Sequence, residues 1–254
     1  EMQEAARWLA DKERARLQLG DQPIGDIFSL LENQGLRIIR IAIPNSKLDG
    51  AFAYERNKGA FALVNASRSK GKQTFTAAHE YCHFLKDRAD GYHPCQIHDD
   101  YTAQLRQKEL ERFANVFATH FLMPETGVRE VVESQFGLGH GLRAEEVIYL
   151  KRYFGVSYIA MLLRLRELGY LSEERYEQLA RVRVIALERR LYGDAEVDRE
   201  QLEAPPRVPP LLAVLALEAY NRGLISLSRL AEIWRMKSAE AQEILREAGY
   251  VDEQ

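Results

Sequence analysis

The chain has 254 residues, 46% of them hydrophobic, so it can bury a core as one large domain or two small ones. Its formal net charge of −3 gives no global field that would attract nucleic acid. There is no apolar run of about 18 residues and no signal-peptide pattern, so neither a membrane-spanning helix nor a secretory leader is predicted. The two cysteines, Cys82 and Cys95, offer no disulfide framework, and we expect a cytoplasmic setting.

The first part of the chain is predicted to form two helices and a small antiparallel sheet. Residues 2–19 read as a helix that we expect to pack on the core through Trp8, with a linker helix from an upstream domain as the alternative. Asp26–Asn33 reads as a second helix that ends at Gly35. Strands are predicted at Leu36–Ile43, Ala51–Tyr54 and Ala60–Asn65.

The segment Gln73–Arg88 follows the sheet and contains the sequence HEYCH at residues 79–83. It has no Pro or Gly and carries apolar residues at helical spacing, so we predict a helix. His79 and His83 then lie on one face, about 6 Å apart along the axis, and can bind one Zn²⁺. Glu80 lies between them and can act as a base on water held at the metal. The alternative is that the HEYCH motif occurs by chance. A third metal ligand elsewhere in the chain would decide between the two interpretations.

A second helix, predicted over Lys108–Phe121, offers that third ligand. Glu111 and Asn115 are one turn apart on the face beside its apolar stripe. Glu111 can bind the metal, and Asn115 can hydrogen-bond a histidine of the first helix. Glu109 is the competing carboxylate, but it has no polar residue four positions on. The alternative for Glu111 is a solvated position on the helix face.

These two segments, TFTAAHEYCH and ERFANVFATHFLMP, resemble the ImmA/IrrE family of metallo-endopeptidases. That family pairs an rFTlAHElgH helix with a helix of the pattern E-x-x-A-[ND]-x-F-A-x-x-x-L-M-P. The likeness covers roughly Pro23–Gln135 and, more loosely, Leu142–Leu171. The resemblance implies zinc ligands at His79, His83 and Glu111, and a catalytic base at Glu80. It also implies a protein substrate, because characterised members cleave helix-turn-helix repressors.

The predicted fold class is therefore α+β, a mostly helical zincin-like metallopeptidase with a small antiparallel sheet and a C-terminal helical unit. We predict an N-terminal helix at 1–22, a metallopeptidase domain with a helical extension at 23–191, a linker at 192–210, and a small helix-turn-helix-like unit at 211–254. The linker is acidic and contains four prolines. In the C-terminal unit we expect helices at Leu211–Arg222, Ser226–Trp234 and Ser238–Ala248.

Further helices are predicted in the extension, at Pro124–Phe136, Ala144–Phe154, Ser157–Leu168 and Glu173–Leu191. The two central ones resemble a helix-turn-helix. We expect them to pack on the protease, with docking of DNA or a repressor as the alternative. The C-terminal unit is near neutral, which favours binding of a partner or dimerisation over direct DNA binding.

The segment Ala89–Leu105 joins the two motif helices and contains histidines, carboxylates and Cys95. We expect a lid or substrate loop there. A second metal site, or Cys95 as an inhibitory fourth ligand, is the alternative. The donor that stabilises the oxyanion stays open among Tyr54, Tyr92, His93 and His120.

The leading interpretation is a zinc endopeptidase, with Mn²⁺ as the alternative metal, that cuts a specific intracellular regulatory protein. The strand at Gly50–Tyr54 is one hypothesis for substrate binding by strand addition, and a covered edge without a ligand role is the other. The competing function is a zinc-stabilised, non-cleaving regulator or antitoxin-like protein that binds a repressor or DNA. Because related chains often carry a DNA-binding domain ahead of the protease, an upstream segment is also an open alternative.

Overall fold

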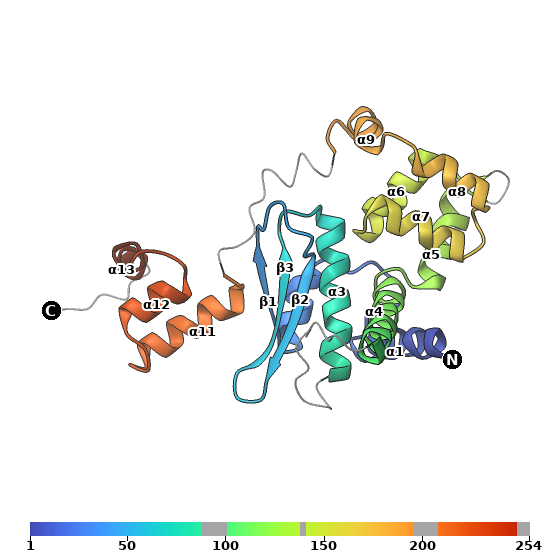
Figure 1. Cartoon of the computed structure of the whole chain (residues 1–254). Helices are drawn as coiled ribbons and strands as arrows, with labels where there is room; N and C mark the ends of the chain where they lie inside the picture. Colours follow the sequence, from blue (N-terminus) through green and yellow to red (C-terminus); the bar gives the residue numbers. More distant parts are fainter. Residues whose placement is uncertain (88–100, 138–140, 196–207, 248–254) are drawn as a thin grey trace.

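The computed structural model describes residues 1–87, 101–137, 141–195 and 208–247, with the backbone alone at residues 87 and 101–107. Figure 1 shows a small sheet with α3 (Lys70–Asp87) alongside it, and with α4 (Tyr101–Leu122) and α1 (Met2–Arg16) beyond α3. The predicted mostly helical α+β class is confirmed. No helix in the described ranges is both long enough and apolar enough to cross a membrane.

The sheet is mixed rather than wholly antiparallel. Its strands are β1 (Leu36–Ile41), β2 (Gly50–Glu55) and β3 (Gly59–Asn65), in the order β1-β3-β2. The pair β2–β3 is antiparallel as predicted, whereas β1 runs parallel to β3. The reason is that the connection 42–49 carries the chain past β3, so only β2 and β3 are joined by a tight turn. This order leaves β2 at an edge.

The motif helix α3 and the helix α4 begin earlier than the sequence suggested. α3 starts at Lys70, and α4 starts at Tyr101, so the last five residues of the predicted loop Ala89–Leu105 are helical. The rest of that loop lies outside the described residues, as do Cys95 and most of the predicted linker 192–210.

The N-terminal helix α1 packs on α4, but not through Trp8. Trp8 is 61% exposed, while Ala6 and Ala10 are fully buried in the main core. Small side chains let the two helix backbones come close, which a tryptophan at the contact would prevent. The helix is also fixed by Arg14, which is buried and donates hydrogen bonds to the carbonyl oxygens of Phe121, Gly20 and Gln22.

Further helices build the remainder of the main body: α2 (Ile27–Asn33), α5 (Glu125–Gln135), α6 (Ala144–Phe154), α7 (Tyr158–Glu167), α8 (Glu173–Ala180) and α9 (Val184–Tyr192). The single helix predicted over Glu173–Leu191 is wrong, because the chain breaks at residues 181–183. After the break, α9 packs on α6, where Glu188 is 1% exposed and pairs with Lys151 at 3.1 Å. This pair holds α9 against α6.

The C-terminal helices α11 (Pro210–Asn221), α12 (Leu227–Ile233) and α13 (Ser238–Glu247) gather around their own cluster of buried residues. Trp234 belongs to this cluster, and its indole N–H donates to the carbonyl oxygen of Ala213. The three predicted helices are present, with shifts of at most one residue at their ends. The division of the chain into domains stays a prediction.

Candidate metal centre

Three predicted metal ligands lie together where α3 and α4 meet. His79 and His83 come from α3 and Glu111 from α4, and one ligand atom from each lies within 4.8 Å of the others. The Nε2 atoms of the two histidines are 3.2 Å apart, and the His79 Nε2 is 3.0 Å from Glu111 Oε2. Donors about 2.0–2.1 Å from a tetrahedral Zn²⁺ lie roughly 3.3 Å from one another. The donor set and its spacing therefore fit a single divalent ion.

Asn115 lies where it can orient the first histidine. Its side-chain Oδ1 is 3.0 Å from Nδ1 of His79. Because an amide oxygen only accepts, this contact requires a proton on Nδ1 and leaves Nε2 free as a ligand. Metal-binding histidines commonly hold this tautomer through such a partner.

The carboxyl group of Glu80 is buried next to these ligands. Glu80 is 6% exposed, and burial raises its pKa, although the neighbouring His79 and His83 act in the opposite direction. Burial would also lower the pKa of His79, but its hydrogen bond to Glu111 raises it overall. The negative charge of Glu111 that favours a proton on His79 also favours a metal cation there, because both carry positive charge.

The two helices are held together by aromatic packing on the side away from the ligands. Tyr81, within the motif, is fully buried, and its ring contacts those of Phe117 and Phe121 from α4. The Tyr81 hydroxyl donates to Glu13 of α1 and is 3.3 Å from a guanidinium nitrogen of Arg16. One motif thus serves two purposes, because its buried face fixes α3 against α4 and α1 while its other face presents ligands.

Among the candidates for the oxyanion donor, His120 is placed away from the ligands. It follows Glu111 by nine residues, about 13 Å along an α-helix. It is buried against α7, where Arg164 and Glu167 are its hydrogen-bonding neighbours. Tyr54 lies half-buried on β2. Tyr92 and His93 lie outside the described residues.

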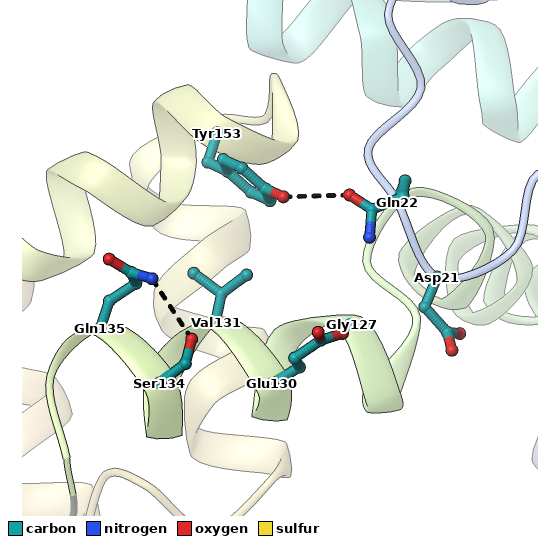
Figure 2. A pocket seen from close by; sticks show the side chains of 8 residues that line it. All are labelled: Asp21, Gln22, Gly127, Glu130, Val131, Ser134, Gln135 and Tyr153. Carbon is teal, nitrogen blue, oxygen red and sulfur yellow. Dashed lines mark hydrogen bonds between the residues drawn. The ribbon is translucent and has the colours of Figure 1, made fainter.

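A hollow on the surface, shown in Figure 2, is separate from the metal ligands. It has a volume of about 150 Å³ and lies between α5, α6 and the connection after α1. Tyr153 reaches across it to donate a hydrogen bond to Gln22. None of the predicted site residues lines it. Its wall residues are mostly exposed, and we assign it no role.

One neighbour of Glu80 was missed at the sequence level. Gly50, the first residue of β2, lies so close to α3 that a Cβ atom there would be 2.8 Å from Glu80 Oε1. The only signal in the sequence is a glycine at the start of a predicted strand, and such glycines often mark a close approach of the backbone.

Comparison with known proteins gives three findings. The model of the IrrE N-terminal-like domain, a peptidase family, matches residues 31–166, just over half of the chain. The radiation response metalloprotease IrrE of Deinococcus radiodurans is 36% identical over 89 residues, which are 35% of this chain and 26% of that protein. A transcriptional regulator of Mycobacterium tuberculosis superposes with a TM-score of 0.45 and 16% identity, over 64% of this chain and 46% of its own.

Proposed function

Because the chain belongs to the IrrE N-terminal-like (ImmA/IrrE) family of metallopeptidases, we propose that it is a metal-dependent endopeptidase whose working site is the α3–α4 junction. The observation that carries this proposal is the meeting of His79, His83 and Glu111 within 4.8 Å, beside the buried carboxyl of Glu80. A purely structural metal site needs no such carboxylate, whereas peptide hydrolysis needs a base.

The proposed chemistry divides the work between the ion and Glu80. A bound Zn²⁺, or Mn²⁺ in its place, supplies Lewis acidity to the scissile carbonyl and makes water in the site more acidic. Glu80 takes the proton from the attacking water and delivers it to the nitrogen of the leaving amine. Its low exposure keeps bulk water from competing for that proton. Asn115 keeps His79 in the tautomer that leaves Nε2 available.

The outer edge of β2, which pairs with no other strand among the residues that the structure describes, is the proposed binding site for the substrate backbone. The amide of Asn65 donates to the carbonyl of Asp49 at 2.9 Å, so residues 49, 51, 53 and 55 face β3 in the ladder. The N–H and C=O groups of Gly50, Phe52 and Tyr54 therefore face the open edge. An extended peptide can pair with these groups as an additional strand, and Gly50 places this edge beside Glu80.

The substrate we propose is an intracellular regulatory protein, with a helix-turn-helix repressor as the first candidate. The relative named IrrE is described as a radiation response metalloprotease, which links that protein to a stress response. The matched region spans 26% of that relative. For this chain, both a role in regulation and the repressor as substrate are therefore proposals.

The deciding experiment is a cleavage assay with helix-turn-helix repressors from the same organism, in the presence of Zn²⁺ or Mn²⁺. Wild type is expected to give defined fragments by intact mass. Glu80→Gln is expected to bind one metal ion per chain and to lower the rate by about 10²–10⁴-fold, because it removes the base and leaves the ligands in place. Cleavage by Glu80→Gln at the wild-type rate would reject Glu80 as the base. A stable complex that is never cut would favour the non-cleaving regulator instead.

The substrate edge has its own test in Phe52→Pro. Proline removes the N–H that faces the open edge but leaves the β2–β3 ladder bonds of Ala51 and Ala53 in place. Phe52→Ala is the matched control, because it also loses the ring that contacts Phe84 but keeps the N–H. We expect the proline variant to bind metal normally and to show at least about a tenfold lower kcat/KM than the alanine variant. Equal kcat/KM values for the two variants would contradict strand addition.

A further inference from the structure

The backbone of Gly50 forms part of the wall around the Glu80 carboxyl group. A Cβ atom at Gly50 would collide with the methyl group of Thr76 and would lie 2.8 Å from Glu80 Oε1 and 2.9 Å from the carbonyl oxygen of Leu63. Thr76 and Glu80 are one helical turn apart on α3 and are both buried, so neither has free space to retreat into. The φ angle of Gly50 is not in the left-handed region, so the close approach, and not the backbone conformation, requires glycine.

The connection that leads into Gly50 is fixed by one buried amide. Asn65 is 1% exposed, and its Oδ1 accepts hydrogen bonds from the backbone N–H groups of Ile43 and Ser67. Its Nδ2 donates to the carbonyl oxygens of Ile43 and Leu48, at 3.1 and 2.9 Å. The side chain therefore uses both of its donors and both acceptor positions. Three of these four bonds go to the two ends of this connection, and the fourth goes to Ser67, just after β3. A satisfied buried network of this kind rigidifies the segment it holds.

Asp49, next to Gly50, ties the same connection to the motif helix. Its Oδ2 is 2.9 Å from Nζ of Lys72 on α3, and its Oδ1 accepts from Nε of Arg68 at 2.7 Å. Arg68 also donates to the carbonyl oxygen of Ser46 at 2.7 Å. Lys72 lies on the same face of α3 as Thr76 and Glu80, two turns before the base. The start of β2 is thus clamped to the helix that carries the proposed base.

From these contacts we infer that Gly50 and Asp49 are positioning residues for Glu80, an inference that rests on the proposed peptidase function. Gly50 provides the surface against which the carboxylate rests. Asp49, held by Lys72 and Arg68, keeps that surface at a fixed distance from α3. These contacts therefore fix both the orientation of the Glu80 carboxylate and the start of the β2 edge that we propose for substrate binding.

The first variant is Gly50→Ala, and its matched control is Gly25→Ala, since a Cβ at Gly25 meets nothing within 4 Å. Both proteins should bind one Zn²⁺ per chain. For Gly50→Ala we expect kcat to fall by about 10–100-fold with KM changed by less than about threefold, because a displacement near 1 Å of a catalytic group has an effect of this size. Gly25→Ala should keep the wild-type kcat. A wild-type kcat in Gly50→Ala would overturn the inference.

A second readout does not depend on activity. With Co²⁺ alone as the probe, the visible absorption spectrum reports groups next to the ion, and Glu80→Gln serves as the reference for a displaced carboxylate. The Gly50→Ala spectrum should move from that of wild type toward that of Glu80→Gln, while Gly25→Ala should not move. If wild type cuts no substrate, the proposed function fails, and this spectrum still decides whether Gly50 positions Glu80. An unmoved spectrum in Gly50→Ala would overturn the inference.

If Gly50→Ala does not fold, as judged by circular dichroism, variants of Lys72 test the positioning of Glu80 in its place. The Lys72 side chain is 48% exposed, so its replacement leaves the core intact. Lys72→Met keeps the length of the side chain and loses the ion pair, and we expect kcat to fall about threefold or more. Lys72→Arg restores a cation for Asp49 and should restore kcat. Equal kcat values in Lys72→Met and wild type would overturn the role of Asp49.

Discussion

At the scale of single residues, the proposed site depends on a few atoms whose positions follow from helix periodicity. His79 and His83 are one turn apart on α3, and Glu111 and Asn115 are one turn apart on α4. Each pair presents one face, so the approach of the two helices is enough to bring the ligand atoms within 4.8 Å. The contact of Asn115 with Nδ1 of His79 leaves Nε2 available to the proposed ion.

This role of Asn115 can be tested by metal affinity. Asn115→Ala removes the acceptor for the Nδ1 proton of His79, and loss of such a partner typically weakens metal binding by about 10–100-fold. Asn115→Asp keeps an acceptor oxygen and is the control. Both affinities can be measured for Zn²⁺ by competition against a chromophoric chelator. An Asn115→Ala protein that binds as tightly as Asn115→Asp would show that the hydrogen bond has no influence on the ion.

The same residues show how far the sequence could lead. The positions of His79, Glu80, His83, Glu111 and Asn115 could be predicted because each depends on spacing within one helix and on a motif of known chemistry. Gly50 could not, because its contact with Glu80 depends on how β2 and α3 pack, which no local pattern encodes. For His120, the residue type left a catalytic role open, and its position on the helix directs it to α7 instead.

At the scale of elements, the positions of helices and strands could be predicted where a local apolar pattern sets them. The predictions failed where a contact with a distant part of the chain matters. The predicted bounds of α6, Ala144–Phe154, match the structure. The break between α8 and α9 was missed because no Pro or Gly marks it in the sequence, while α9 is held by a distant contact, the buried Lys151–Glu188 pair that joins residues 37 positions apart. The parallel pairing of β1 with β3 was missed for a similar reason, because the connection 42–49 carries no sign of which side of β3 it will reach.

The helix-turn-helix likeness of α6 and α7 has a structural explanation at this scale. A Cβ on Gly71, in the first turn of α3, would lie 2.5 Å from the backbone of Val156 and Ser157, so the turn between α6 and α7 is packed directly against the motif helix. The exposed face of α7 presents Ile159 and Leu163. Arg166 of α7 is partly exposed but is paired with Glu173, and apolar side chains such as Ile159 and Leu163 do not form the hydrogen bonds that read base edges. The contact supports the prediction that this pair of helices packs on the protease.

At the scale of the whole molecule, a partly buried polar cluster joins the N-terminal helix α1 to α4 and α7. Arg164 of α7 is 1% exposed and donates to the carbonyl of Met123 and toward His120 of α4. Glu167 accepts from Arg164 at 2.8 Å and from Arg7 of α1 at 2.6 Å. One carboxylate thus connects three helices from distant parts of the sequence. Loss of the Glu167 carboxylate should therefore lower the stability of the whole body rather than that of a single helix.

This cluster makes stability depend on pH in a predictable direction. Hydrogen bonding to His120, together with the charge of Arg164, lowers the pKa of Glu167 to about 2, although burial opposes the shift. A carboxyl group with a lowered pKa in the folded state stabilises the protein fully above its unfolded pKa. That contribution is lost as the pH falls from the unfolded value of 4.5 toward the folded value of about 2.

We therefore expect Glu167→Gln to lower the free energy of unfolding by about 1–2 kcal/mol at pH 7, a figure reduced from the full pKa shift because a third of the side chain is solvent-exposed. Urea unfolding at a series of pH values between 7 and 3 measures this difference, which should shrink steadily toward pH 3. Glu173→Gln is the control, because it removes a carboxylate from an exposed pair with Arg166. A Glu167→Gln deficit that stays constant across the series would show that the lost stability comes from packing and not from the charge that Glu167 shares with α1, α4 and α7.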